Sequence, residues 1–473
     1  MSVPVGQPLA RGRRVALAVV AAVFASALVV KLALVWGEGI RPVGFDATSF
    51  ANSARHWYWG LGYGRYNYIR QPVYPLFVAL TSAIGLPTRV AIELAWFAGA
   101  VVMYGALRAC GLLRVLAGAA AIAMVFHPWT WAWFNHLLQD TLYAPLAVGF
   151  VCALAGAACA ADGKTAWRWG GLAAGLGALA SCTRPESVVL FGSVAVAATM
   201  VMLPRVRTRA LWREGLRRLL PVAAAPVVAI VVFSGAIRAA NYATIGSAVT
   251  TDLLLPGQRD MYSALLAIEP DDGDPRLPIP RDVRERAYAA SPTFARLRPF
   301  LDGEGRPERM DAFQKYARHL TRAEGEFSGW TIWALRDAAW SAAGGEAESF
   351  RSAAELDAFF KAAAVELRAA AADGRLQTRR VLIPFVPPEW GRIAQLAPTT
   401  LERCWEMIAR AKYRPYVRKA DEEARPEIFD PITRSRNKEE ATAAAKRHLP
   451  YQRTLSRPYR AITIGCAAAA VLG

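Results

Sequence analysis

Long apolar runs separated by short basic or aromatic segments fill the first half of the chain. The first run, 15–36, follows an arginine-rich N-terminus and is interrupted only by Lys31. At about 1.5 Å per helical residue, this run is long enough to cross about 30 Å of hydrocarbon. Lys31 is expected to extend its ammonium group toward the far interface. Because the run exceeds the apolar core of a signal peptide and no small-residue cleavage site follows it, the pattern predicts an uncleaved membrane helix.

Six further apolar segments have the pattern of spans, some of them lengthened by their flanks. They are 90–107, 115–126, 142–161, 170–182, 187–203 and 219–237. The segment from Pro72 to Gly85 is too short to cross and is interpreted as an interfacial or re-entrant helix. With seven spans, the arginine-dense loops fall on the N-terminal side, as the positive-inside rule requires. The loops after the first, third and fifth spans then face outward.

The chain changes character after the seventh span. It becomes charged and contains prolines, with no run long enough to cross a membrane until residue 458. Apolar residues at three- and four-residue spacing predict amphipathic helices there. We therefore expect an all-α polytopic membrane protein with three parts: a transmembrane module (1–237) with an outer loop (37–71), a mostly helical soluble outer domain (238–457), and an apolar segment (458–473) with the pattern of a membrane helix cut short.

Composition supports the membrane assignment. Hydrophobic residues make up 54% of the 473 positions, which is too much apolar sequence for soluble domains alone. Much of the formal net charge of +18 lies in the loops on the N-terminal side, so anionic lipid headgroups are a simpler partner than nucleic acid. Five of the six cysteines lie in or beside apolar segments, and their spacing indicates neither a disulfide framework nor a cysteine-based zinc site.

Charged and aromatic side chains gather on the predicted outer face. The first outer loop contains Asp46, Arg65 and Arg70 among tryptophans and tyrosines that favour headgroup depth. The loop between the third and fourth spans contains His136 and Asp140, and the fifth and sixth spans are joined by a Thr-Arg-Pro-Glu turn, 183–186. Charged groups near membrane depth are costly unless they have a partner or a function.

Each of these residues also has a purely structural interpretation. Asp46 is suited to cap a helix that starts near Ala47, and Asp140 to cap the following span. Arg184 and Glu186 would form an ion pair that closes the hairpin. His127 and the tryptophans at 129, 131 and 133 have the composition of interfacial anchors. The residue types alone leave both interpretations open.

The order of these motifs resembles that of a known superfamily. A first span is followed by an outer-loop aspartate (Asp46), then Arg-Gln-Pro-Val-Tyr-Pro (70–75) leads into a short helix, an acid (Asp140) precedes a span, and the Thr-Arg-Pro-Glu turn follows. This pattern over residues 14–260 is similar to the GT-C superfamily of membrane glycosyltransferases. Protein O-mannosyltransferases and the enzymes that transfer aminoarabinose to lipid A are among its members. An Arg-Asn-Tyr element of that superfamily is displaced here, because Arg238 is separated from Asn241-Tyr242 by two alanines.

The resemblance implies an activity. The donor would be a sugar linked to a polyprenyl phosphate, and the acceptor a hydroxyl of a lipid, glycan or protein at the outer, periplasmic face of a bacterial inner membrane, with the N-terminus cytoplasmic. Asp46 would be the base that takes the acceptor proton during inverting attack. The leaving phosphate needs cations, for which Arg184 is the first candidate, followed by Arg70, Arg65 and His136. Asp140 would hold the acceptor, orient a cation or bind a divalent metal, and Glu186 would position Arg184.

Two other functions fit the same sequence. A transporter or flippase for lipid-linked sugars would also have charged groups at membrane depth, although no inverted repeat is evident. A non-catalytic envelope scaffold would use Asp46 as a helix cap alone. In the outer domain, Glu324, Glu326, Trp330 and Trp333 are candidates to line an acceptor groove, but their spacing favours a packed amphipathic helix over that role. The identity of the sugar and acceptor, the need for a metal and the oligomeric state stay open.

Overall fold

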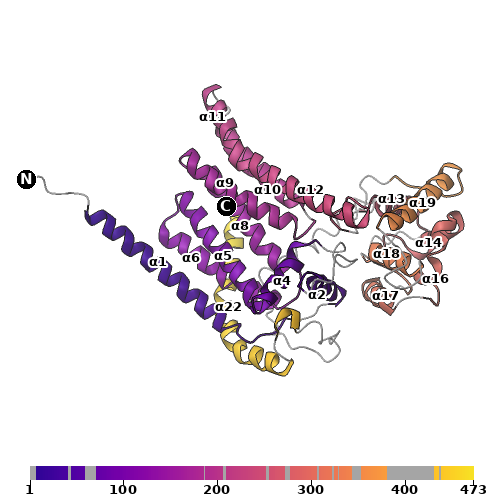
Figure 1. Ribbon diagram of the computed structural model, residues 1–473, viewed down its shortest axis with the longest axis horizontal. Helices are drawn as coiled ribbons and strands as arrows, with labels where there is room; N and C mark the ends of the chain where they lie inside the picture. Colours follow the sequence, from indigo (N-terminus) through magenta and orange to yellow (C-terminus); the bar gives the residue numbers. More distant parts are fainter. Residues whose placement is uncertain are drawn as a thin grey trace, which may run out of the picture. The chain divides into compact units, whose positions relative to one another are not determined.

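The computed structural model describes thirteen segments of the chain, and apart from short connections they are helical (Figure 1). These segments are 7–40, 44–58, 71–185, 187–205, 209–251, 255–271, 277–305, 308–321, 324–328, 330–342, 353–380, 431–435 and 438–472. Within them the single extended pairing is a bridge between Ile268 and Thr378. The all-α class predicted from the sequence is therefore confirmed for the described residues.

The chain forms two compact units. The first comprises Met1–Ala236 and Trp405–Gly473, and the second comprises Ile237–Cys404. The sequence pattern placed residues up to 457 with the second region, whereas in the structure the described residues 431–435 and 438–472 belong to the first unit. The reason is tertiary: side chains of the C-terminal helix bond to the segment that follows the first helix.

Several helices of the first unit coincide with apolar runs of the sequence, whereas the helix 209–219 is basic and the helix 225–245 continues past the unit boundary at residue 237. The helices of this unit are α1 (Gln7–Ala33), α2 (Gly44–Tyr58), α4 (Val73–Ala83), α5 (Thr88–Ala109), α6 (Arg114–Val125), α7 (Pro128–Trp133), α8 (Asp140–Cys159), α9 (Gly163–Ser181), α10 (Ser187–Met202), η1 (Leu203–Arg205), α11 (Arg209–Leu219), the π-helical turn η2 (Leu220–Ala224), α12 (Ala225–Ile245) and α22 (Lys438–Leu472). The short helix expected between Pro72 and Gly85 is α4.

Four helices among the described residues are long and apolar enough to cross a membrane. They are Thr88–Ala109, Asp140–Cys159, Val188–Arg205 and Leu211–Thr244, and the apolar parts of α1 and α4 are shorter. Seven spans were expected. The remaining three expected segments coincide with α1, α6 and α9, of which α6 has only 12 residues. By length and composition, these four helices are compatible with a membrane protein.

Small residues let these helices approach one another closely. Helix α8 packs against α5 on one side and α9 on the other (Figure 1). A Cβ atom added at Gly156 of α8 would lie 2.6 Å from the ring of Trp169 on α9, and one at Gly177 of α9 would lie 2.8 Å from Phe150. Both distances are shorter than those that real Cβ atoms keep from their neighbours, so neither position has room for a side chain. In an apolar environment such small-residue crossings supply the packing that holds helices together.

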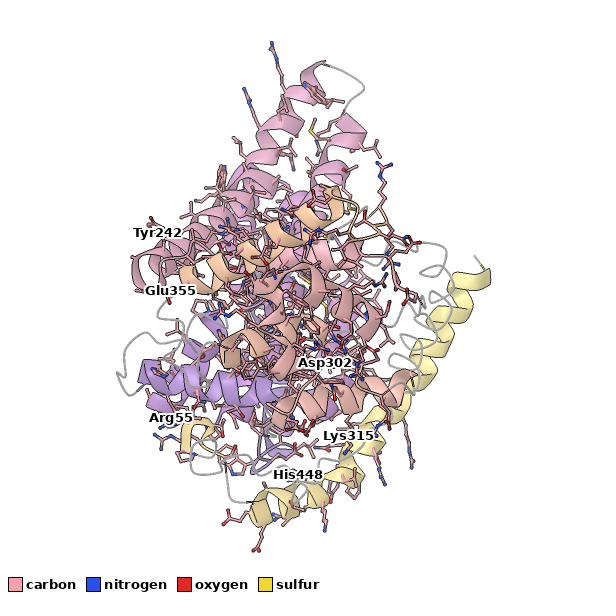
Figure 2. All side chains as sticks on the ribbon, turned by 90° about the vertical axis from the view of Figure 1, so that its right-hand side faces the viewer. Arg55, Tyr242, Asp302, Lys315, Glu355 and His448 are labelled. Carbon is pink, nitrogen blue, oxygen red and sulfur yellow. The ribbon has the colours of Figure 1, made fainter. Side chains whose placement is uncertain are left out.

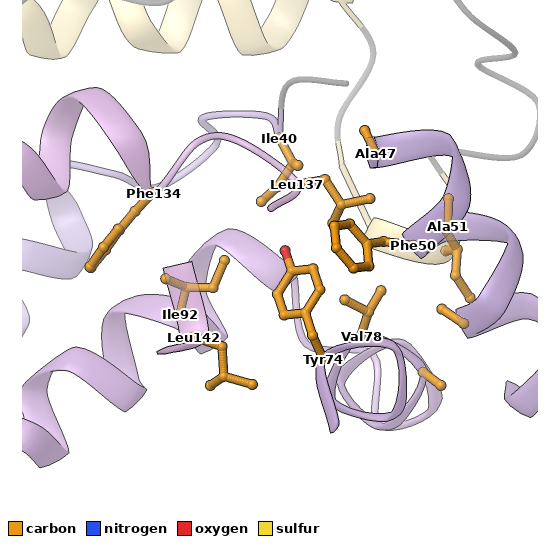
Figure 3. Close-up of a cluster of buried hydrophobic side chains, with 13 residues drawn as sticks. Ile40, Ala47, Phe50, Ala51, Tyr74, Val78, Ile92, Phe134, Leu137 and Leu142 are labelled. Atoms are coloured by element: carbon orange, nitrogen blue, oxygen red, sulfur yellow. The ribbon is translucent and has the colours of Figure 1, made fainter. Parts of the chain in front are cut away.

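A hydrophobic cluster joins the elements that carry the predicted site motifs (Figure 3). Phe50 of α2 meets Tyr74 of α4 edge to face, with ring centroids 4.9 Å apart. Both side chains are buried, as are Leu137 in the loop before α8 and Leu142 in the first turn of α8. Helix α2 therefore packs its apolar face against α4 and against the residues around the start of α8.

The second unit is a small bundle built around one buried arginine. Its helices are α13 (Pro256–Ala267), α14 (Arg281–Ala290), α15 (Pro292–Ala295), α16 (Arg298–Leu301), α17 (Glu308–Thr321), α18 (Thr331–Ala342) and α19 (Ala353–Ala372). The guanidinium of Arg284 on α14 donates to both oxygens of Asp302 at 2.9 and 2.7 Å and to Glu326 at 3.1 Å. Two backbone carbonyls accept its other hydrogen bonds. The charge is thus fully compensated inside the bundle.

Candidate functional site

Asp46 lies in the first turn of α2. The helix begins at Gly44, three residues before the start near Ala47 that the sequence suggested, so Asp46 is not the residue that precedes the helix. Its neighbour Ala47 is fully buried in the hydrophobic cluster, whereas Asp46 itself is partly exposed. A carboxylate in the first turn is favoured by the positive end of the helix dipole. The position therefore combines a fixed backbone with access to a ligand.

The Arg-Gln-Pro-Val-Tyr-Pro motif and the Thr-Arg-Pro-Glu turn meet in the structure. The backbone amide of Val73, the first residue of α4, donates to the carbonyl of Cys182 at 3.2 Å, immediately before the turn. Pro72 precedes α4 and Pro75 lies in its first turn, where a missing amide proton costs no intrahelical bond. Thr183 bonds to the carbonyl of Leu179 at 2.7 Å and ends α9.

Arg184 forms an ion pair with Asp140. The two residues come from the loop after α9 and the first turn of α8, and their side chains are 26% and 50% exposed. The guanidinium also lies over the ring of Tyr143, 5.8 Å from its centroid. Gln139, not Asp140, occupies the N-cap position of α8. Of the roles left open for Asp140, the orientation of a cation corresponds to a contact in the structure.

Of the remaining predicted site residues, the structure describes only His136. His136 lies in the loop between α7 and α8, with its Nδ1 atom 3.1 Å from the carbonyl of Trp133. Arg65, Arg70 and Glu186 lie outside the described residues. Among the residues that are described, no group of three or more histidine, cysteine or acidic side chains has the geometry of a metal site.

In the second unit, three of the four residues suggested for an acceptor groove contact neighbouring side chains, and the fourth lines a cavity. Glu326 accepts from Arg284 and is a packing residue of the buried network. Trp330 stacks on Phe313, with ring centroids 5.7 Å apart, and Trp333 contacts the guanidinium of Arg336. Glu324 instead lines a cavity of about 330 Å³ together with side chains of α17. Glu326 is therefore packed but lies in a non-helical segment, and of these four residues only Trp333 lies in a helix, α18.

A buried charge cluster was missed by the sequence interpretation. Lys31 does not extend outward: it is 1% exposed, bonds to Thr130, and lies 3.6 Å from Glu93 Oε1. Its ammonium also sits 3.3 Å from the ring centroid of Trp131, which is buried and is therefore not an interfacial anchor. Arg89 donates to Glu93 at 2.5 Å.

This cluster also affects a nearby histidine. Burial, together with the positive charge of Lys31, lowers the pKa of His127, which caps α7 by accepting from the amide of Trp129.

The sequence did contain a signal for the buried charge cluster: Arg89 and Glu93 are four residues apart at the start of an apolar helix. Ionisable residues in such a position are costly and imply partners.

The comparisons with known proteins give no further identification. No family model, no curated protein and no solved structure matches this chain.

Proposed function

We propose that this protein is a membrane glycosyltransferase of the GT-C type, which moves a sugar from a polyprenyl-phosphate donor to an acceptor hydroxyl with inversion. The observation that carries the proposal is the ion pair between Asp140 and Arg184, beside the contact of Val73 with Cys182. These contacts bring together segments that carry three motifs distant in sequence, and the order of those motifs along the chain resembles that of the superfamily.

The proposed reaction needs one base and one anion-binding group. Asp46 takes the proton from the acceptor hydroxyl as its oxygen attacks the anomeric carbon. The bond from that carbon to the phosphate oxygen breaks, and the phosphate leaves as an anion. A leaving group that is stable as an anion needs positive charge rather than a proton, which a guanidinium supplies through paired hydrogen bonds.

Within this mechanism Asp140 orients Arg184. A carboxylate that holds a guanidinium fixes its plane, so that less freedom is lost when phosphate binds. Four helices of membrane-spanning length and composition agree with a donor whose chain lies in a bilayer. Arg65, Arg70, His136 and Glu186 remain candidates for further donor contacts.

The experiment compares the wild type with Asp46→Asn in a purified membrane preparation. Both are incubated with a panel of radiolabelled polyprenyl-phosphate sugars and a membrane extract that supplies acceptors, and release of sugar from the carrier is scored. Loss of a positioned base should lower turnover about 10²–10⁴-fold. Asp373→Asn, which changes an exposed acid of the second unit, is the control. Full activity of Asp46→Asn would contradict the proposal.

The same assay separates the alternative functions. Movement of a lipid-linked sugar across vesicles without cleavage of the sugar phosphate would favour a transporter or flippase. Absence of both cleavage and transport, with normal folding of the protein, would favour an envelope scaffold.

A further inference from the structure

The C-terminal helix α22 bonds to the segment that leads to Asp46. Gln452 of α22 donates from its Nε2 atom to the carbonyl of Leu34 at 2.9 Å and to Glu38 Oε1 at 2.7 Å. His448, one helical turn earlier and labelled in Figure 2, has its Nδ1 atom 3.5 Å from the same Glu38 oxygen. Gln452 is completely buried and Glu38 is 9% exposed.

Glu38 is also part of the buried charge cluster. Its Oε2 atom lies 3.8 Å from Arg89 Nε, and Arg89 in turn pairs with Glu93. A buried carboxylate of this kind is tolerated only while its partners stay in place, because the attraction between the charges must offset the lost hydration. The position of segment 34–40 is therefore coupled to α5 on one side and to α22 on the other.

Further contacts hold the end of this segment. A Cβ atom built on Gly39 would lie 3.0 Å from the Cβ atom of Ala441, so α22 approaches the backbone closely. The amide of Ile40 donates to Ser435 Oγ at 3.2 Å. Arg434 bonds to the carbonyl of Ser82 at the end of α4 through two nitrogens, at 3.1 and 3.0 Å.

The held segment lies directly before the helix that carries Asp46. Ile40 is 1% exposed and belongs to the same hydrophobic cluster as Ala47 and Ile432 (Figure 3). Only six positions separate Ile40 from Asp46 in the sequence. Because Ile40 and Ala47 share this cluster, a shift of segment 34–40 would disturb the packing of the first turn of α2.

We infer that Gln452 is a positioning residue for Asp46. Its bonds to segment 34–40, together with the contacts of residues 431–435, fix the start of α2. The inference rests on the proposed function for its catalytic consequence, but the structural coupling can be measured without any activity. The predicted effect is on turnover rather than donor binding, because Gln452 acts through Glu38 on the placement of the base and not on the donor itself.

The docking of α22 is tested first by disulfide formation. Gly39→Cys combined with Ala441→Cys should form an intramolecular disulfide under mild oxidation, since Cβ atoms about 3.5–4.5 Å apart are required and only a small shift is needed. Ala443→Cys, two residues further along α22, is the control partner for Gly39→Cys and should not react. Peptide mapping by mass spectrometry identifies the pair. Equal cross-linking of both pairs would overturn the docking geometry.

The coupling itself is tested by hydrogen exchange. Gln452→Leu keeps the side-chain volume but removes the donor, and it should accelerate exchange of peptides that cover 44–58. Thr454→Val on the same helix changes an exposed residue that bonds only to its own helix, and exchange should stay at the wild-type rate. Unchanged exchange over 44–58 in Gln452→Leu would overturn the inference whether or not the protein transfers sugar.

The kinetic readout links the coupling to catalysis. Gln452→Leu should lower kcat about tenfold or more at an unchanged donor KM, which a loss of folded protein alone would not reproduce once rates are expressed per folded molecule. A wild-type kcat in Gln452→Leu, measured while exchange over 44–58 is accelerated, would overturn the positioning role. Faster exchange in Gln452→Leu with no transfer by the wild type would reject the proposed function and leave the coupling established.

Discussion

Asp140 and Arg184 form an ion pair although they are 44 residues apart in the sequence. One is in the first turn of α8 and the other follows the end of α9. Because α8 and α9 pack along their lengths through small residues, the start of one helix and the end of the other lie at the same end of the pair. The pairing of these two side chains is thus a consequence of helix packing.

The effects of Arg184 and Asp140 on the transfer rate should be energetically coupled. Arg184→Lys keeps the charge but loses the planar fork, and turnover should fall about tenfold or more, since a charge-assisted hydrogen bond contributes about 1.5–3 kcal/mol and about 1.4 kcal/mol is a factor of ten. Asp140→Asn should lower turnover less. Combining the two substitutions should cost less than the sum of their separate effects, as a double-mutant cycle of transfer rates would measure. Strict additivity would mean that the two residues act independently.

The buried cluster around Glu93 should dominate the stability of the first unit. Glu93→Gln leaves the ammonium of Lys31 and the guanidinium of Arg89 without their shared carboxylate, and should destabilise the protein by about 3–5 kcal/mol. Thermal unfolding in detergent measures the effect. Glu439→Gln, an exposed substitution on α22, should change the melting temperature little. A melting temperature unchanged by Glu93→Gln would show that the cluster is not energetically coupled.

Arg284 should be the most sensitive arginine of the second unit. Arg284→Met leaves Asp302 and Glu326 buried without a counter-charge, with an expected loss of about 3–5 kcal/mol. Arg286→Met on the same helix removes a partly exposed pair with Asp282 and should cost at most about 1 kcal/mol. Urea unfolding followed by hydrogen exchange of residues 281–301 distinguishes the two. Similar losses for both variants would contradict the buried network as the main support.

The second unit should lose stability in acid. Burial opposes ionisation of Asp302, but hydrogen bonds and charge from Arg284 outweigh it and lower the pKa of that carboxyl. Hydrogen bonds from Ser291 and Thr293 likewise outweigh burial and lower the pKa of Glu366. For a carboxyl with a lowered folded pKa, the unfolded chain binds more protons between the two pKa values, so the stabilisation is complete above the ordinary pKa of about 4 and is lost below it.

Hydrogen exchange of residues 281–301 as a function of pH checks this expectation. After correction for intrinsic rates, protection should be constant from about pH 7 to pH 5 and should fall below about pH 4. Glu366→Gln should remove part of this acid dependence because its amide carries no titrating proton in that range. Protection that rises as the pH falls would contradict the assigned direction of both pKa shifts.

The helices could be predicted from the sequence better than the arrangement of the site residues. The short helix α4 and the amphipathic helices α18 and α19 follow from the spacing of apolar residues, which is a local property of the chain. Asp46 was placed correctly near a helix start, but its position inside the first turn depends on where α2 begins. The charge cluster was not predicted, because an isolated lysine in an apolar run has the same pattern whether it reaches water or an internal carboxylate.

The sequence by itself determined that this chain is built of apolar helices, with charged and aromatic residues gathered in particular loops. Periodicity and composition suffice for that conclusion, because they act over one or two helical turns. Only the tertiary structure decided that Arg184 faces Asp140, that Lys31 faces Glu93, and that Gln452 bonds to Leu34 across 418 positions of sequence. A buried charge is stable only beside its partner, and which partner it meets is set by how the helices pack rather than by any residue near it in the chain.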